Sequence, residues 1–117
     1  MPLLADKTTP DGLRVITASG ELDRTDVPYV RNAVVRAFGR GRSAVVLDMS
    51  GVTYIDSSIL AALIAESLDA DKRGATLASV TGSAGILRSL ELKGLTQVMH
   101  ISETIQEAAA ALPPAEH

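Results

Sequence analysis

The amino-acid sequence predicts one α/β domain built on a mixed, mostly parallel sheet. Its 117 residues are the length of a single domain, and an apolar content of 46% suffices for one core. Apolar runs of strand length alternate with segments of helical spacing, which is the pattern of a parallel sheet covered by helices. Residues 44–49 are apolar on both faces, as in a covered central strand. We expect the domain to span residues 1–112 and a C-terminal tail to follow at residues 113–117.

The predicted strands and helices follow the order ββαβαβαβα. Five segments have the length and composition of strands: residues 3–8, 13–19, 44–49, 75–80 and 97–101. Pro10, Asp11 and Gly12 lie between the first two strands and predict a hairpin turn. The helices are expected to begin at residues that can cap a first turn: Thr25 or Asp26, Asp56, Ser83 and Ser102.

The junction between the central strand and the second helix organises the rest of the chain. After residues 44–49 the sequence predicts a turn, a short second apolar patch, and then Asp56, Ser57 and Ser58 at the mouth of the helix. The inward stripe of this helix is expected at four apolar positions: Leu60, Leu63, Ile64 and Leu68. The first N–H groups of a helix lack intrahelical partners and favour negative charge. The polar side chains at this mouth are therefore the first candidates for function.

The composition argues against several classes of function. There is no cysteine, which excludes disulfides, thiolate metal sites and thiol redox chemistry. A net charge of -3 and the scarcity of aromatic residues argue against nucleic-acid binding, which uses basic clusters and stacking surfaces. No apolar run reaches the roughly 18 residues that span a bilayer, and the N-terminus does not have the pattern of a leader. We expect a cytoplasmic protein that binds neither nucleic acid nor membrane.

Residues suited to catalysis are scarce. The histidines are His100, in the last predicted strand, and His117, so a serine hydrolase would have to bring His100 to Ser57 or Ser58. Nothing around His100 has the pattern of a nucleophile elbow, and an ordinary strand histidine is the favoured interpretation. A small hydrolase that uses Ser57 is one functional hypothesis, and it is less favoured than the two protein-binding hypotheses described below. We expect that the protein is not an enzyme.

Metal and nucleotide sites have equally weak support. Asp23, Asp48 and Asp56 could converge on Mg²⁺, although capping or loop hydrogen bonding is the favoured role for such carboxylates. No glycine-rich phosphate motif follows any strand. Residues 81–85 come nearest, but they lack the lysine and the full spacing and predict a turn with Ser83 as a helix cap. We therefore expect no metal and no cofactor.

A phosphorylated serine accounts better for the residues at the helix mouth. A phosphate on the first turn would gain from the free N–H groups and from the helix dipole. Asp56, and Asp23 if the first loop lies close, would repel that phosphate. The modification would make the surface strongly anionic with little change in the backbone. Such a change suits a switch that a partner protein reads.

Three stretches together resemble the STAS family, and within it the bacterial anti-sigma factor antagonists. They are Gly20-Glu21-Leu22-Asp23, residues 45–58 ending in Asp56-Ser57-Ser58, and Leu90-Glu91-Leu92-Lys93-Gly94-Leu95. With the order of elements they span nearly the whole chain, and the Asp-Ser-Ser segment in its strand–helix context is the most specific of the three. The resemblance implies a four-helix, mixed-sheet domain with no catalytic activity of its own.

The resemblance also implies partners and site residues. The expected partner is an anti-sigma factor that is also an ATP-dependent serine kinase. Binding it frees a sigma factor, and a partner phosphatase removes the phosphate. The phosphoacceptor maps to Ser57, with Ser58 as the fallback. The expected contact surface comprises Glu21, Asp23, Asp56, Ser57, Ser58 and Ile59. We expect a monomer or a weak homodimer.

Ile59 departs from the family pattern, because phosphorylated members usually have glycine after the acceptor pair. A helical wheel places Ile59 about 100° from the stripe of Leu60 and Ile64, at the edge of the core or exposed. There it could block a kinase from the backbone, offer a partner an apolar anchor, or lie partly buried. Ile59 therefore favours a second functional hypothesis, an unphosphorylated STAS scaffold or sensory interaction module.

Overall fold

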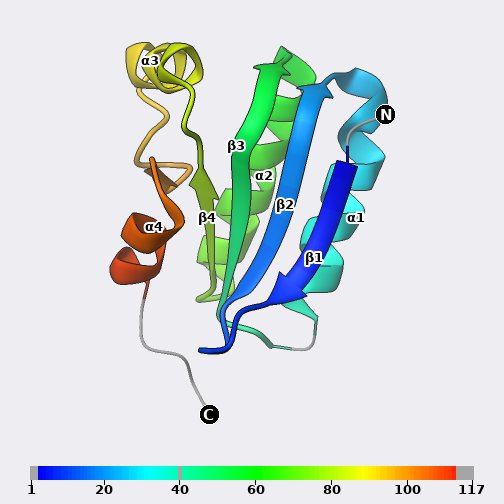
Figure 1. Cartoon of the computed structure of the whole chain (residues 1–117), viewed down its shortest axis with the longest axis vertical. Helices are drawn as coiled ribbons and strands as arrows, with labels where there is room; N and C mark the ends of the chain where they lie inside the picture. Colours follow the sequence, from blue (N-terminus) through cyan, green and yellow to red (C-terminus); the bar gives the residue numbers. More distant parts are fainter. Residues whose placement is uncertain (1–2, 40, 113–117) are drawn as a thin grey trace.

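The computed structural model describes residues 3–39 and 41–112 and confirms the predicted α/β class. Five strands form one sheet in the order β1-β2-β3-β4-β5, in which β1 is antiparallel to β2 and every other neighbouring pair is parallel (Figure 1). The strands are β1 (Leu3–Thr8), β2 (Arg14–Leu22), β3 (Ala44–Ile55), β4 (Thr76–Val80) and β5 (Ile101–Ser102). The helices are the short 3₁₀ helix η1 (Arg24–Asp26), α1 (Val27–Phe38), α2 (Ser57–Lys72), α3 (Ala84–Leu92) and α4 (Ile105–Ala111). The predicted tail at residues 113–117 lies outside the described residues.

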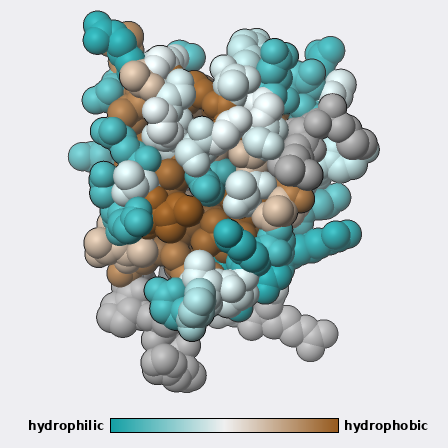
Figure 2. Space-filling model, in the orientation of Figure 1, coloured by the Kyte–Doolittle hydropathy of each residue, from teal (hydrophilic) through white to brown (hydrophobic). Residues whose placement is uncertain are grey.

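The helices cover the two faces of the sheet unequally. α1 and α2 pack against one face and enclose the larger core, which includes Ile16 and Leu47 (Figure 1). α4 covers the opposite face over β3 and β4, where Val15 and Val46 belong to a smaller core. In the view of Figure 2, hydrophobic side chains gather in the lower part of this face within a hydrophilic surround. The apolar run of β3 is therefore covered on both faces, as predicted.

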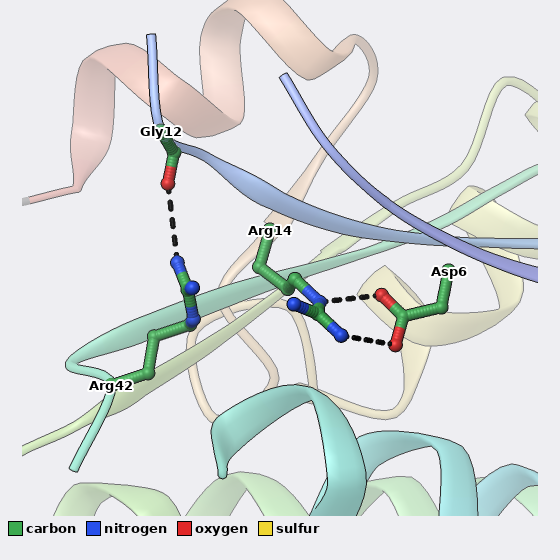
Figure 3. Close-up of polar contacts among 4 residues, drawn as sticks. All are labelled: Asp6, Gly12, Arg14 and Arg42. Carbon is green, nitrogen blue, oxygen red and sulfur yellow. Dashed lines mark hydrogen bonds and ion pairs between the residues drawn. The ribbon is translucent and has the colours of Figure 1, made fainter. Parts of the chain in front are cut away.

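β1 and β2 form the predicted hairpin. Gly12 in its turn has a φ of 90°, which favours glycine. Arg14 on β2 donates two hydrogen bonds to Asp6 on β1, with Nε–Oδ1 and Nη2–Oδ2 distances of 2.6 and 2.8 Å (Figure 3). These hydrogen bonds raise the pKa of the Arg14 guanidinium above its ordinary value. Figure 3 also shows Arg42 donating to the carbonyl of Gly12 at 3.2 Å, which ties the turn to the segment before β3.

β2 and β3 run further than the sequence predicts. β2 continues to Leu22, and β3 continues to Ile55 through the position where the sequence predicts a turn. The register of the β2–β3 pairing shifts between Thr17 and Ser19 and again between Gly20 and Glu21, as it does at β-bulges. A Cβ atom added to Gly51 would lie 3.1 Å from the Cβ of Ser19, so glycine lets the two strands stay paired there.

α2 is rotated relative to the predicted orientation. Ile59, predicted at the edge of the core or exposed, is fully buried with Leu63, whereas Leu68, predicted to face inward, is 46% exposed. The buried face continues through two small residues, Ser67 and Ala70. Small side chains let a helix approach a sheet closely. A stripe chosen by apolar content alone therefore misses the face that packs.

The end of the sheet also differs from the prediction. β5 consists of Ile101–Ser102 rather than residues 97–101, because residues 96–100 form a turn. His100 ends that turn with a φ of 50°, so its predicted place within a strand is wrong. The composition of this segment is that of a strand, and it gives no sign that His100 adopts a left-handed backbone conformation.

Of the four predicted helix caps, two are confirmed and one is wrong. Asp26 lies at the N-cap position of α1, but its side chain makes no capping hydrogen bond there. Asp56 caps α2, and the Ser83 hydroxyl caps α3. Ser102, predicted to cap the last helix, instead belongs to β5, and the side chain of Thr104 caps α4. Both residues are good N-caps. Pairing with β4 decides between them, because it draws Ser102 into the sheet.

We expect Ser79→Ala to raise the free energy of unfolding by about 1–2 kcal/mol. The Ser79 hydroxyl is buried and has no hydrogen-bond partner in the part of the chain that the structure describes. Removing the hydroxyl removes its desolvation cost with little change in volume. Urea denaturation of both proteins measures the difference. Ser83→Ala is the control. It should lower the free energy of unfolding, because the Ser83 hydroxyl that it removes accepts a hydrogen bond from the Ile86 amide. A less stable Ser79→Ala protein would contradict the account of this hydroxyl.

Candidate functional site

The C-terminal ends of β2 and β3 meet at one edge of the sheet, at the top of Figure 1. Leu22 and Ile55, the last residues of the two strands, are in register. η1 follows the first strand and α2 follows the second. Loops after neighbouring parallel strands lie side by side, and this edge is where α/β folds commonly place functional groups. The structure thus brings the segment around Asp23 to the mouth of α2.

Asp56 caps α2 and links it to the segment after β2. One carboxylate oxygen, Oδ1, accepts hydrogen bonds from the amides of Ser58 and Ile59 at 3.0 and 3.1 Å. The other, Oδ2, accepts from the amide of Arg24 at 2.9 Å. The Asp56 amide donates to the carbonyl of Leu22 at 3.1 Å. Both oxygens of Asp56 are therefore engaged within the chain, one of them across a separation of 32 residues.

Asp23 organises the segment that Asp56 holds, which we call the Asp23 loop (residues 23–26). Its Oδ1 accepts from the amide of Thr25 at 2.9 Å. In return, the Asp23 amide donates to Oδ2 of Asp26 at 2.9 Å, which completes a capping box. Asp26 is only 7% exposed, whereas Asp23 is exposed. The loop is thus an ordered turn that presents the Asp23 side chain at the surface.

We expect the carboxyl of Asp23 to have a pKa below its ordinary value of 3.8. The hydroxyl and the amide of Thr25 donate to Asp23 and favour its ionised form, the hydroxyl having the larger effect. Because the folded-state pKa is lowered, the contribution of Asp23 to stability is present above the unfolded-state pKa. It is lost as pH falls through the folded-state pKa.

An NMR titration of the Asp23 carboxyl carbon measures this pKa directly. Thr25→Val removes the hydroxyl donor and keeps the shape of the side chain, so it should move the pKa back toward 3.8. A pKa at or above 3.8 in the unmodified protein would show that the Thr25 hydrogen bonds do not form in solution.

Ser57 is the first residue of α2 and its side chain is exposed, whereas Ser58 is half-buried. The amides of Ser58 and Ile59 already have Asp56 as their acceptor. These N–H groups are therefore not free for a phosphate, contrary to the expectation from the sequence. The Ser57 hydroxyl is an accessible group on the fixed first turn of a helix, next to the carboxylate that holds this turn in place.

Ile59 is not part of the exposed surface. Its side chain is 0% exposed and lies in the core beneath the first turn of α2. A partner cannot reach it in this conformation, so its expected place in the contact surface is wrong. For the same reason it does not stand between Ser57 and an approaching protein.

Tyr54 is exposed two residues before the cap of α2, and it is not among the predicted site residues. Its side chain is 52% exposed, and it is in register with Glu21, which is also exposed. The register shift between Gly20 and Glu21 changes the alternation of inward and outward residues near the end of β3. Exposed tyrosines are common anchors in protein interfaces. An aromatic residue two positions before the helix cap is the only sequence signal for it.

His100 lies far from the exposed serine. Its Nε2 is 3.0 Å from Oδ1 of Asp71, near the C-terminal end of α2. Asp71 is about 20 Å from Ser57 along the helix axis, at about 1.5 Å per residue. A groove of about 330 Å³, lined in part by His100 and Leu112, lies by β4, β5 and α4, away from the helix mouth. The structure therefore contradicts a hydrolase that pairs His100 with Ser57.

Asp48 does not converge with Asp23 and Asp56. Its Oδ1 accepts from the amide and the hydroxyl of Ser50, at 3.0 and 2.5 Å, within its own strand. Among the described residues, no cluster of three His, Cys, Asp or Glu residues could hold a metal ion. Over the same residues, no helix is both long enough and apolar enough to cross a bilayer.

The sequence and the fold match one known family. A model of the STAS domain matches residues 5–108. The chain belongs to the STAS domain family. The strand–helix junction with Asp56 and Ser57 therefore lies within the matched part of the chain, as does the Asp23 loop.

Solved structures share this STAS fold at low sequence identity. An anti-sigma factor antagonist from Mycobacterium paratuberculosis matches with a TM-score of 0.81 and 22% identity, over 95% of this chain and 93% of that chain. The Bacillus anti-sigma factor antagonist SpoIIAA in its unphosphorylated form matches with a TM-score of 0.73 and 16% identity, over 92% and 93% of the two chains. The murine anion transporter Slc26a9 matches with a TM-score of 0.66 and 22% identity, over 84% of this chain but 17% of that chain. The STAS fold thus occurs in small antagonist proteins and as a minor part of a transporter.

Proposed function

We propose that this STAS domain is an anti-sigma factor antagonist. It binds an anti-sigma factor that is also an ATP-dependent serine kinase, and the bound kinase releases a sigma factor. Phosphorylation of Ser57 ends the binding, and a partner phosphatase restores it. The observation that carries the proposal is the exposed Ser57 on the first turn of α2, held beside the ordered Asp23 loop by Asp56. We place this activity in the cytoplasm, with the protein as a monomer or weak homodimer.

The chemistry at the helix mouth is that of a substrate rather than of a catalyst. Among the described residues, the histidine His100 lies at Asp71, far from Ser57, and both oxygens of Asp56 accept backbone hydrogen bonds. A protein kinase needs an accessible hydroxyl, and it brings its own base and nucleotide. The Ser57 oxygen would attack the γ-phosphorus of ATP, ADP would leave, and a base of the kinase would take the hydroxyl proton. The domain itself supplies shape and charge and acts as no enzyme.

A phosphate on Ser57 would change this surface strongly. It adds a charge of about −1.5 to −2 at neutral pH. Asp56 precedes Ser57 directly, and the exposed Asp23 lies in the loop that Asp56 contacts. A partner surface that fits the serine hydroxyl would have to accommodate three more oxygens and their uncompensated charge. This supports a switch in which phosphorylation ends the interaction.

The test is incubation of the protein with purified anti-sigma factor kinase and Mg-ATP, followed by intact-mass measurement. We expect one phosphate on the unmodified protein and on Ser58→Ala, and none on Ser57→Ala. A phosphate that persists in Ser57→Ala and disappears in Ser58→Ala would move the acceptor to Ser58. If the kinase neither transfers phosphate to the protein nor associates with it, the proposal is overturned.

The alternative is an unphosphorylated STAS scaffold or sensory module. It is favoured by the presence of the fold within Slc26a9, of whose chain the match covers only 17%. The same experiment separates the two functions. Stable association with a partner that never transfers phosphate would favour the scaffold.

A further inference from the structure

The Asp56 side chain connects the two segments that form the proposed contact surface. Its Oδ1 holds the first turn of α2 through the amides of Ser58 and Ile59. Its Oδ2 holds the Asp23 loop through the amide of Arg24, at 2.9 Å. A displacement of this carboxylate would therefore break hydrogen bonds to both segments.

We infer that Asp56 is a positioning residue that couples Ser57 to the Asp23 loop, and that a phosphate on Ser57 releases the loop from α2. This inference rests on the proposed phosphorylation of Ser57. It differs from a purely local effect of the phosphate, because it places a consequence of the modification on a segment 32 residues earlier in the chain.

The phosphate would act on Asp56 in two ways. It would stand on the neighbouring residue as a like charge, and like charges close together repel. It is also a stronger acceptor for the N–H groups of the first turn, which phosphates at helix N-termini bind readily. Those N–H groups are the ones that Asp56 now holds. Displacement of the carboxylate from them also removes the acceptor of the Arg24 amide.

The Asp23 loop keeps its internal hydrogen bonds when this acceptor is lost. Its other side-chain hydrogen bonds lie inside the loop, between Asp23 and Thr25 and between Asp23 and Asp26. The residue before it, Leu22, is fully buried, and its carbonyl accepts the backbone amide of Asp56. Leu22 before the loop and the buried Asp26 at its end therefore stay in place, and the segment between them shifts. The exposed carboxylate of Asp23 moves with the loop.

The experiment measures hydrogen exchange of the Arg24 amide by NMR in protein carrying phosphoserine at position 57. The phosphoserine is introduced during translation, so the measurement needs no kinase. We expect the Arg24 amide to exchange at least tenfold faster than in the unmodified protein. The negative charge of the phosphate slows base-catalysed exchange, so charge alone would change the rate in the opposite direction. The Ile86 amide, held by the Ser83 cap of α3, is the internal control and should keep its rate.

Asp56→Ser is the matched variant, because serine still caps α2 but is too short to reach both segments. It should raise the exchange rate of the Arg24 amide without any phosphate, and phosphoserine at position 57 should then add no further increase. An Arg24 amide that keeps its protection in the phosphoserine protein would overturn the inference. Failure of the kinase assay would instead count against the proposed function, and the two results are independent.

Discussion

Ile59→Ala is expected to lower the free energy of unfolding by about 2–5 kcal/mol. The side chain is 0% exposed and lies in the core formed by α1, α2 and the sheet. Truncation removes buried methyl and methylene groups and leaves a cavity beneath the first turn of α2. Denaturation in urea, with the slope of the transition compared between proteins, measures the loss.

Leu68→Ala is the matched control for Ile59→Ala. It removes a similar volume from the same helix, but Leu68 is 46% exposed. The free energy of unfolding should therefore fall by no more than about 1 kcal/mol. Equal losses from the two variants would contradict the orientation of α2. A larger loss from Leu68→Ala would support the apolar stripe that the sequence predicts.

Phosphoserine at position 57 is expected to weaken binding of the anti-sigma factor by about 100-fold or more. The interface would have to desolvate a dianionic group beside Asp56, and an unpaired charge in an interface costs several kcal/mol. Isothermal titration calorimetry with the purified anti-sigma factor measures the effect. Ser57→Ala should bind within about threefold of the unmodified protein, because it removes only a hydroxyl group.

A phosphoserine at position 106 is the control for charge alone. Gln106 is exposed on α4, which covers the opposite face of the sheet from α1 and α2. A phosphate there should leave the affinity nearly unchanged. Equal weakening by phosphate at both positions would mean that net charge, and not the surface around Ser57, controls the interaction.

Local signals in the sequence predicted most of the fold. The hydrophobic run of β3, the Pro-Asp-Gly turn of the hairpin, and the caps Asp56 and Ser83 each depend on a few neighbouring residues. Alternation of strands with helices then fixes the order of the elements and the parallel pairing. These features need no information about distant contacts.

The errors arose where distant contacts decide the outcome. The rotation of α2 depends on how closely Ser67 and Ala70 let it approach the sheet, and this buries Ile59 instead of Leu68. The continuity of β3 depends on Gly51 packing against Ser19 of the neighbouring strand. A helical wheel and a turn signal describe one segment at a time, so neither can report these contacts.

The candidate site was predictable in its residues but not in its connections. Asp56, Ser57 and Asp23 stand out by residue type and position, and the structure brings them to one edge of the sheet. The hydrogen bond from the Arg24 amide to Asp56 spans 32 residues and involves a backbone group, so no sequence pattern marks it. Tyr54 was missed because a register shift decides which way it faces.

The most direct test of the proposed function is the release of a sigma factor from its complex with the anti-sigma factor. The unmodified protein is added to the preformed complex, and the free sigma factor is measured by its fluorescence anisotropy. We predict that the unmodified protein and Ser57→Ala release the sigma factor in proportion to their concentration, whereas protein with phosphoserine at position 57 does not. An intact complex at saturating unmodified protein, or equal release by the phosphorylated form, would contradict the account.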